Sequence, residues 1–381
     1  MHPKRLLKRY LLFILFLADK FLNLFRKKEE PARLLTDANK ILVINFCRIG
    51  DIITLTPFLR ELKGIFKNAK ITIVLLNKTS DILKHNPYVN EIIPVKNTKD
   101  IYEWINLFFK LRKKSYDLVF NPVWMLKSSF LAVLLFPRFM AGYINDLSFT
   151  AKNFNLHKIE YRGLKIKGNI FFAHKDNIID RGLKTLSLWK THSFSRRPEL
   201  FLEEDKIEGY LYLVSEKKGP AVAIHAGSAS KFKQWPAENY KTLVTKLLDN
   251  SPNIQIALVG GRTELFFLKK VKNIINNSAR VTNYINKLTL RKTAFVLSQC
   301  NLLIASDSGI MHLASAVGLR TIALFGPTSP ERAGPFGSDN IIITHRVPCS
   351  PCEQIKCRGT PNCMELITVD EVFSSIIKII G

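Results

Sequence analysis

The chain has 381 residues, too many for one ordinary hydrophobic core, so two domains are expected. Apolar residues make up 47% of it, which is enough for well-packed interiors, and no low-complexity tract or short-period repeat is visible. The excess of 57 Lys and Arg over 31 Asp and Glu gives a net charge of +26 and indicates an anionic partner, namely nucleic acid, phospholipid headgroups or a phosphorylated substrate.

Residues 1–36 are basic and hydrophobic. The apolar run Tyr10–Ala18 is shorter than the roughly 20 residues that span a bilayer, and Ala18-Asp19-Lys20 is a poor signal-peptide cleavage site. We expect a helix lying in the interface of an anionic membrane. A short transmembrane anchor and a helix packed on the protein itself remain alternatives.

Strands and helices then alternate. Short apolar, β-branched runs predict buried strands at 40–46, 71–76, 91–95, 117–122 and 139–143. Helical spacing occurs at 54–66, 100–114, 128–136 and 177–189. This alternation predicts an α/β domain with a parallel sheet, which we place at residues 37–200.

A second alternation follows a polar junction near 197–204. It predicts strands at 221–227, 254–261, 302–305 and 321–330, and helices at 237–248, 263–275, 289–300, 312–318 and 369–380. The second domain is placed at residues 201–381. We therefore expect two Rossmann-like, doubly wound domains facing a central cleft, with ligands outside the carboxyl ends of the strands.

Four loops that follow strands carry candidate site residues. In the first, Gly50 permits a tight turn and Asp51 falls near a helix start. Asp51 is either a plain N-cap or a carboxylate that faces the cleft and accepts a proton. The loop matches neither the dinucleotide-binding GxGxxG pattern nor the Walker pattern.

The second and third loops offer polar groups directly after strands. Ser228, Lys231 and Lys233 favour an anion-binding loop over a merely solvated one. Glu264 follows two glycines in a first helical turn, where it either complements the helix dipole or accepts hydrogen bonds from ribose hydroxyls.

The fourth loop reads SDSGIMH. Asp307 either caps a helix or faces the cleft, and Ser308 and Gly309 lie where the first helical amides lack internal partners. Such a helix start binds anions. His312, one turn on, is either a structural residue or a donor to phosphate.

Six cysteines occur, and Cys47 and Cys300 resemble small core residues. Cys349, Cys352, Cys357 and Cys363 are spaced C-x₂-C-x₄-C-x₅-C, and a structural zinc or iron–sulfur site, a disulfide and reduced thiols all remain open. No DxD-like metal motif stands out in a loop after a strand, so no obligatory metal is expected.

Taken together, these loops resemble glycosyltransferase family 9, the ADP-heptose–lipopolysaccharide heptosyltransferases. The matching segments are RIGDIITLTP, AHKDNIIDRGL, HAGSASKFKQWP, LVGG with Glu264, SDSGIMHLASAVG with TIALFGPTSPERAGPFG, and CSPCEQIKCRGTPNCMELITVDEV. The resemblance implies a GT-B fold, ADP-heptose as donor and inversion at the anomeric carbon.

The resemblance also implies roles for single residues. Asp51 would be the general base that deprotonates the acceptor hydroxyl. Lys233 and Ser228 would bind the donor phosphates, and Glu264 would hold the ribose. The contacts to the sugar and diphosphate would come from Asp307, Ser308, Gly309 and His312.

We therefore expect an inverting glycosyltransferase that transfers heptose from ADP-heptose to the lipid A-linked inner core of lipopolysaccharide. It would bind peripherally to the anionic inner face of the cytoplasmic membrane. The alternatives are a transferase of the same fold with another nucleotide-sugar, a catalytically dead scaffold, and a non-catalytic anion- or nucleic-acid-binding protein. Nucleic acid is disfavoured as a partner because the basic residues are spread along the chain without a recognisable nucleic-acid motif.

Overall fold

The computed structural model describes residues 38–96, 100–122, 126–135, 137, 139–144, 157–162, 170–172, 177–187, 189, 193–202, 219–352, 357 and 362–381. They divide into two compact units, one within Met1–Arg48 and Leu55–Ser195 and the other within Ile49–Thr54 and Arg196–Gly381. The basic, hydrophobic segment 1–36 lies outside the described residues, so the expectation of an interfacial helix there stays a prediction.

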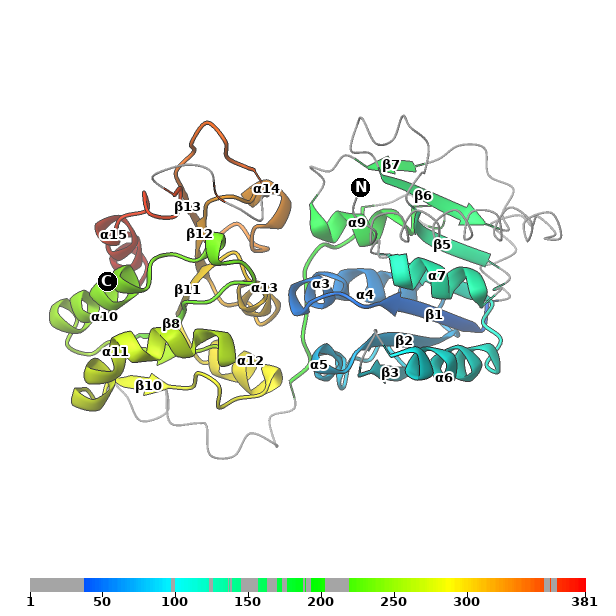
Figure 1. Cartoon of the computed structure of the whole chain (residues 1–381), viewed down its shortest axis with the longest axis horizontal. Coiled ribbons are helices and arrows are strands. Elements are labelled where there is room, and N and C mark those ends of the chain that lie inside the picture. Colours follow the sequence, from blue (N-terminus) through cyan, green and yellow to red (C-terminus); the bar gives the residue numbers. More distant parts are fainter. Residues whose placement is uncertain are drawn as a thin grey trace. The chain divides into compact units, whose positions relative to one another are not determined.

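The first unit is built on a seven-stranded sheet with the order β3-β2-β1-β4-β5-β6-β7 (Figure 1). Its strands are β1 (Lys40–Asn45), β2 (Lys70–Leu76), β3 (Glu91–Val95), β4 (Leu118–Asn121), β5 (Phe139–Ile144), β6 (His157–Arg162) and β7 (Ile170–Phe172). The first five pair in parallel as expected, whereas β6 and β7 pair antiparallel. The sequence did not suggest β6, because HKIEYR lacks the continuous apolar run of a buried parallel strand.

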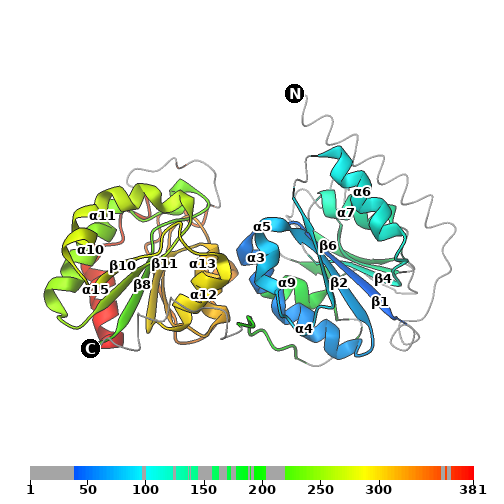
Figure 2. The same cartoon turned by 90° about the horizontal axis from the view of Figure 1, so that it is seen from below.

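Helices cover both faces of this sheet. They are α4 (Thr56–Ile65), α5 (Asn77–Ser80), the short 3₁₀ turn η1 (Asp81–Leu83), α6 (Ile101–Arg112), α7 (Leu126–Leu134) and α9 (Ile178–Lys184). Figure 2 shows α6 and α7 on one face and α4 and α9 on the other. Leu107 and Leu111 of α6 pack with Leu131 of α7 and Val119 of β4 in one buried cluster.

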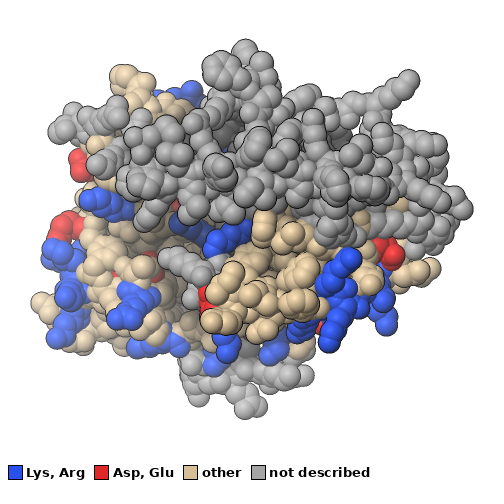
Figure 3. Space-filling model, turned by 45° about the vertical axis from the view of Figure 1, so that its right-hand side comes forward, with Lys and Arg blue, Asp and Glu red and all other residues tan. Residues whose placement is uncertain are grey.

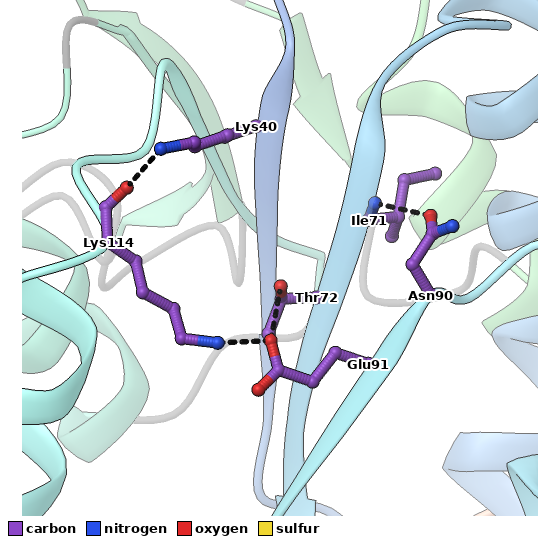
Figure 4. Close-up of polar contacts among 6 residues, drawn as sticks. All are labelled: Lys40, Ile71, Thr72, Asn90, Glu91 and Lys114. Atoms are coloured by element: carbon purple, nitrogen blue, oxygen red, sulfur yellow. Dashed lines mark hydrogen bonds and ion pairs between the residues drawn. The ribbon is translucent and has the colours of Figure 1, made fainter.

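Polar contacts join the strands of the first unit where they begin (Figure 4). The Glu91 carboxylate accepts a hydrogen bond from the Thr72 hydroxyl at 3.3 Å and forms an ion pair with Lys114. The hydrogen bond from Lys114 is the main cause that lowers the pKa of Glu91. Lys40 Nζ donates to the Lys114 carbonyl at 3.2 Å. The edge strand β3 is thereby tied to β2, to β1 and to the segment that follows α6.

The second unit is built on a fully parallel, six-stranded sheet with the order β10-β9-β8-β11-β12-β13. Its strands are β8 (Ala221–His225), β9 (Gln255–Leu258), β10 (Val281–Asn283), β11 (Leu302–Ser306), β12 (Thr321–Phe325) and β13 (Ile341–Thr344). Numbered along the chain, this order is the 3-2-1-4-5-6 of a Rossmann fold, and it reverses between β8 and β11. Ligands of such sheets bind at that reversal.

Helices also flank the second sheet on both sides (Figure 2). The helices and turns of this unit are α3 (Ile49–Thr54), the 3₁₀ turns η4 (Lys231–Lys233) and η5 (Arg262–Glu264), α10 (Ala237–Asn250), α11 (Leu265–Asn277), α12 (Leu290–Ser298), α13 (Gly309–Ala316), α14 (Pro330–Ala333) and α15 (Val369–Ile380). Figure 2 shows α10, α11 and α15 on one side of the sheet and α12 and α13 on the other. Trp235 and Tyr240 are fully buried with their rings edge to face at 4.8 Å.

The expectation of two Rossmann-like α/β domains is therefore confirmed. Within the part of the chain that the structure describes, no helix is both long and apolar enough to cross a membrane.

Candidate active site

The Asp307 carboxylate, directly after β11, is held by two side-chain donors of the second unit. Its Oδ2 atom lies 2.7 Å from Lys233 Nζ and accepts a hydrogen bond from the Thr328 hydroxyl, also at 2.7 Å. Thr328 is buried, and the carboxylate side chain is only 11% exposed. The two donors fix the position of this carboxylate.

The loop after β8 meets the loop after β11 because the two strands are neighbours in the sheet, with Ala305 beside His225 in the register. Ser228 Oγ donates to the Asp307 carbonyl at 2.8 Å. Trp235 N donates to Ser306 Oγ at 3.4 Å. These bonds hold the Ser228–Trp235 loop at the reversal point of the strand order.

Two lysines of this loop differ in their surroundings. Lys233 points to Asp307, whereas Lys231 is exposed and its ammonium lies 5.2 Å from the centre of the Phe232 ring. Only Lys233 is therefore brought into the cluster with Asp307 and Ser228.

The amino end of α13 follows Asp307 directly. Ser308 precedes the helix in an extended conformation and is buried, and its hydroxyl finds no hydrogen-bond partner among the described residues. The first amides of a helix lack internal partners, and the helix dipole favours negative charge there. The unpartnered hydroxyl and the helix start together offer donors to an anion.

The short helix α3, which carries Asp51, packs against α13. A Cβ atom at Gly309 would overlap the Ile49 side chain, and a Cβ at Gly50 would lie 2.9 Å from His312 Cδ2. Glycine is needed at both positions because the two helices approach each other this closely. Asp51 is half-buried on α3 and directly follows Gly50, which lies against His312 in the first turn of α13.

His312 is buried in that first turn. Burial lowers its pKa to about 4, the nearby Lys233 lowers it too, and the Asp307 carboxylate opposes the shift only in part. The imidazole is therefore neutral at pH 7. A neutral imidazole carries one N–H donor and one acceptor nitrogen, so His312 can donate a single hydrogen bond without adding charge.

Glu264 lies after β9, the neighbour of β8 on its other side. Its carboxylate is buried and accepts hydrogen bonds from Gly261 N and the Thr263 hydroxyl. It also lies directly against Gly227, where any Cβ atom would overlap it. The pKa of the buried His225 beside it is lowered by burial, although Glu264 opposes this shift. A carboxylate has about four lone-pair positions, so this one can accept further hydrogen bonds.

The structure thus brings the candidates Ser228, Lys233, Asp307, Ser308, Gly309 and His312 together around one helix start, with Asp51 on the adjoining helix. Thr328 was missed by the sequence interpretation. The signal was its position in GPTSP directly after β12, which is the neighbour of β11.

None of the six cysteines, all of which are described, forms a disulfide, and Cys363 is the one that is buried. Burial and the neighbouring Cys352, Cys357 and Cys349 thiols raise the pKa of Cys363. Across the described ranges, no group of three or more His, Cys, Asp or Glu side chains is placed to hold a metal ion. The suggested zinc or iron–sulfur site at these cysteines therefore has no support in the structure.

Comparison with known proteins identifies relatives over most of the chain. A lipopolysaccharide heptosyltransferase 2 of Salmonella typhimurium is 26% identical over 324 residues, which is 80% of this chain and 87% of the relative. The solved structure of the Escherichia coli ADP-heptose lps heptosyltransferase II superposes with a TM-score of 0.68 at 21% identity, covering 89% of this chain and 98% of that one.

A second E. coli heptosyltransferase, solved with ADP-2-deoxy-2-fluoro heptose, gives a TM-score of 0.63 at 19% identity and covers 89% of this chain and 99% of that one. These likenesses show the GT-B fold, with its two Rossmann-like domains. The model of glycosyltransferase family 9 (heptosyltransferase) matches residues 104–362, more than half of the sequence. The chain therefore belongs to glycosyltransferase family 9 and is a glycosyltransferase.

Proposed function

We propose that this enzyme transfers heptose, with inversion, from ADP-heptose to the lipid A-linked inner core of lipopolysaccharide. One observation carries the proposal. The Lys233 ammonium, the amides at the start of α13 and the unpartnered Ser308 hydroxyl converge where a diphosphate binds in sheets of this kind. The names of the relatives supply the sugar and the acceptor.

The donor diphosphate would bind to groups that remain available beside the Lys233–Asp307 pair. A lysine ammonium has three N–H donors, and one of them is directed at Asp307 Oδ2. The others can donate to phosphate oxygens and stabilise the charge that develops on the departing ADP. Asp307 would hold Lys233 in place and accept hydrogen bonds from the sugar, and Glu264 would accept hydrogen bonds from the ribose.

Asp51 would act as the general base. The acceptor oxygen forms its bond to the anomeric carbon while the bond from that carbon to the diphosphate breaks, and the acceptor proton passes to the Asp51 carboxylate. Attack opposite to the leaving group inverts the configuration. His312, neutral at pH 7, would donate one hydrogen bond to the sugar or the diphosphate.

The acceptor is a phosphorylated glycolipid, so the enzyme would work at the inner face of the cytoplasmic membrane as a peripheral protein. The net charge of +26 supports an anionic surface as its partner.

The test is turnover by the full chain with ADP-heptose and, separately, with UDP-hexoses. We expect ADP-heptose to be used and Asp51→Asn to lower transfer by about 10²- to 10⁴-fold while ADP-heptose still binds. Preferential use of a UDP-hexose would show that the donor is not ADP-heptose. Unchanged turnover of Asp51→Asn would refute the assignment of Asp51 as the general base. In a strain lacking this protein, mass analysis of the lipopolysaccharide core should show a loss of heptose.

A further inference from the structure

Helix α6 of the first unit exposes a stripe of large apolar side chains. Ile101 is 64% exposed, Tyr102 76%, Ile105 44% and Phe109 58%. Seven large apolar side chains are exposed in the described part of the chain, and these four are on one helix of 12 residues. An apolar patch of this kind on a surface helix marks a site of interaction.

The stripe is separate from the face with which α6 packs on its own sheet. Leu107 and Leu111 are buried in the core cluster of the first unit, and Trp104 and Phe108 pack against it. Ile101, Ile105 and Phe109 follow one another at four-residue spacing and so lie one above the other on another side of the helix. The helix therefore has one apolar side in the core and a second one in solvent.

Basic residues continue the exposed stripe at its carboxyl end. Lys113 comes four residues after Phe109, hence one turn further along the same side, and Lys110 adjoins it; both are exposed. The acidic residues of α6 lie at the other end, where Asp100 and Glu103 accept hydrogen bonds from the Tyr102 and Lys96 amides. Lys and Arg also predominate over Asp and Glu on the described surface drawn in Figure 3.

We propose that this α6 stripe, formed by Ile101, Tyr102, Ile105 and Phe109, docks on the surface of an anionic lipid bilayer. The apolar side chains would enter the boundary between headgroups and acyl chains, and Lys110 and Lys113 would face the anionic headgroups. The inference rests on the proposed function, because an enzyme with a lipid-borne acceptor has to meet it at a membrane surface.

Charge favours a bilayer over the other occupants that would cover an apolar face. A second copy of a chain with net charge +26 would bring like charge toward Lys110 and Lys113. The basic segment 1–36 of the same chain would likewise bring positive charge toward these two lysines. An anionic bilayer would bury the apolar stripe and attract the two lysines at the same time.

The test uses the full chain and vesicles without acceptor, of phosphatidylcholine alone or with 30% phosphatidylglycerol as roughly the anionic fraction of a bacterial membrane. The variant Ile105→Ser/Phe109→Ser should bind the anionic vesicles at least about ten-fold more weakly. The matched control is Leu265→Ser/Phe266→Ser on α11, whose side chains are 37% and 38% exposed. The control should bind as the unaltered chain does.

The lysines are tested by Lys110→Gln/Lys113→Gln. Each lysine near an anionic surface contributes about five-fold, so the double variant should lose about 25-fold on anionic vesicles. Hydrogen exchange supplies a readout that does not depend on total affinity, since binding should slow exchange across residues 101–113. Unchanged exchange there, equal binding to both kinds of vesicle, or equal losses in the α6 and α11 variants would each overturn the proposal.

Two further measurements separate this inference from its alternatives. A dimer that becomes a monomer in Ile105→Ser/Phe109→Ser would assign the stripe to a second copy and overturn bilayer docking. Heptosyl transfer to a water-soluble, acyl-free acceptor should be unchanged in the α6 variants. If the unaltered chain fails in that transfer but binds anionic vesicles through α6, the proposed function falls while the docking surface stands.

Discussion

Thr328→Val removes one hydroxyl from the candidate site with little change in shape. The lost hydrogen bond is 2.7 Å long and runs to Asp307 Oδ2 from a side chain that is 2% exposed. A hydrogen bond to a charged group contributes about 1.5–3 kcal/mol. If Thr328 holds Asp307, and through it Lys233, in the position that binds the donor, kcat/KM for the donor should fall by about 10- to 150-fold.

Thr328→Ser is the matched control because it keeps the donor hydroxyl, and it should retain most of the activity. The assay is steady-state transfer at varied ADP-heptose concentration, with the melting temperature measured for both variants. A role of Thr328 in positioning predicts a loss of activity in the valine variant at an assay temperature well below its melting temperature, where the variant is fully folded. Equal kcat/KM in the valine and serine variants would refute the reasoning.

Three other predictions concern stability. Gly309→Ala should lower the free energy of unfolding by about 1–3 kcal/mol in a denaturant titration, because the new Cβ would overlap Ile49. Gly64→Ala in α4 should instead raise it by about 0.5–1 kcal/mol, since nothing lies within 4 Å of the new Cβ; a loss there would contradict the packing described. The pKa of His312 falls from 6.5 to about 4 on folding, so the unfolded chain binds the proton more tightly. Stability should therefore drop by up to about 3 kcal/mol as the pH falls from 6.5 to 4, and His312→Asn should flatten that slope.

The sequence predicted most of the two sheets because their strands are buried on both faces. Such strands are continuous β-branched, apolar runs, as in KILVIN of β1 and TIALF of β12. Four strands were not predicted. The antiparallel β6 is polar, and β7 and β10 have only three residues each, too few to form such a run. The fourth strand, β13 (IIIT), carries the apolar run, so its omission was an error of the sequence interpretation.

The candidate residues could be found from the sequence because polar residues directly after neighbouring parallel strands meet at one edge of a sheet. The contacts that these residues make with one another could not be predicted from the sequence. That Lys233 rather than Lys231 reaches Asp307 depends on how the η4 turn directs each side chain. The contact of Thr328 with Asp307 depends on the adjacency of β12 and β11, which no local pattern encodes. The grouping of α3 with the second unit likewise could not be predicted. It follows from the close packing of α3 against α13 at Gly50 and Gly309, which are far apart in the chain.

Binding of ADP by calorimetry, without acceptor, tests the claim that Lys233 and the start of α13 hold the donor diphosphate. Loss of a charge-assisted hydrogen bond predicts about 10- to 100-fold weaker binding for Lys233→Met, whereas Lys231→Met, two residues away, should bind nearly as the unaltered enzyme does. Unchanged affinity in Lys233→Met, or an equal or larger loss in Lys231→Met, would contradict the account.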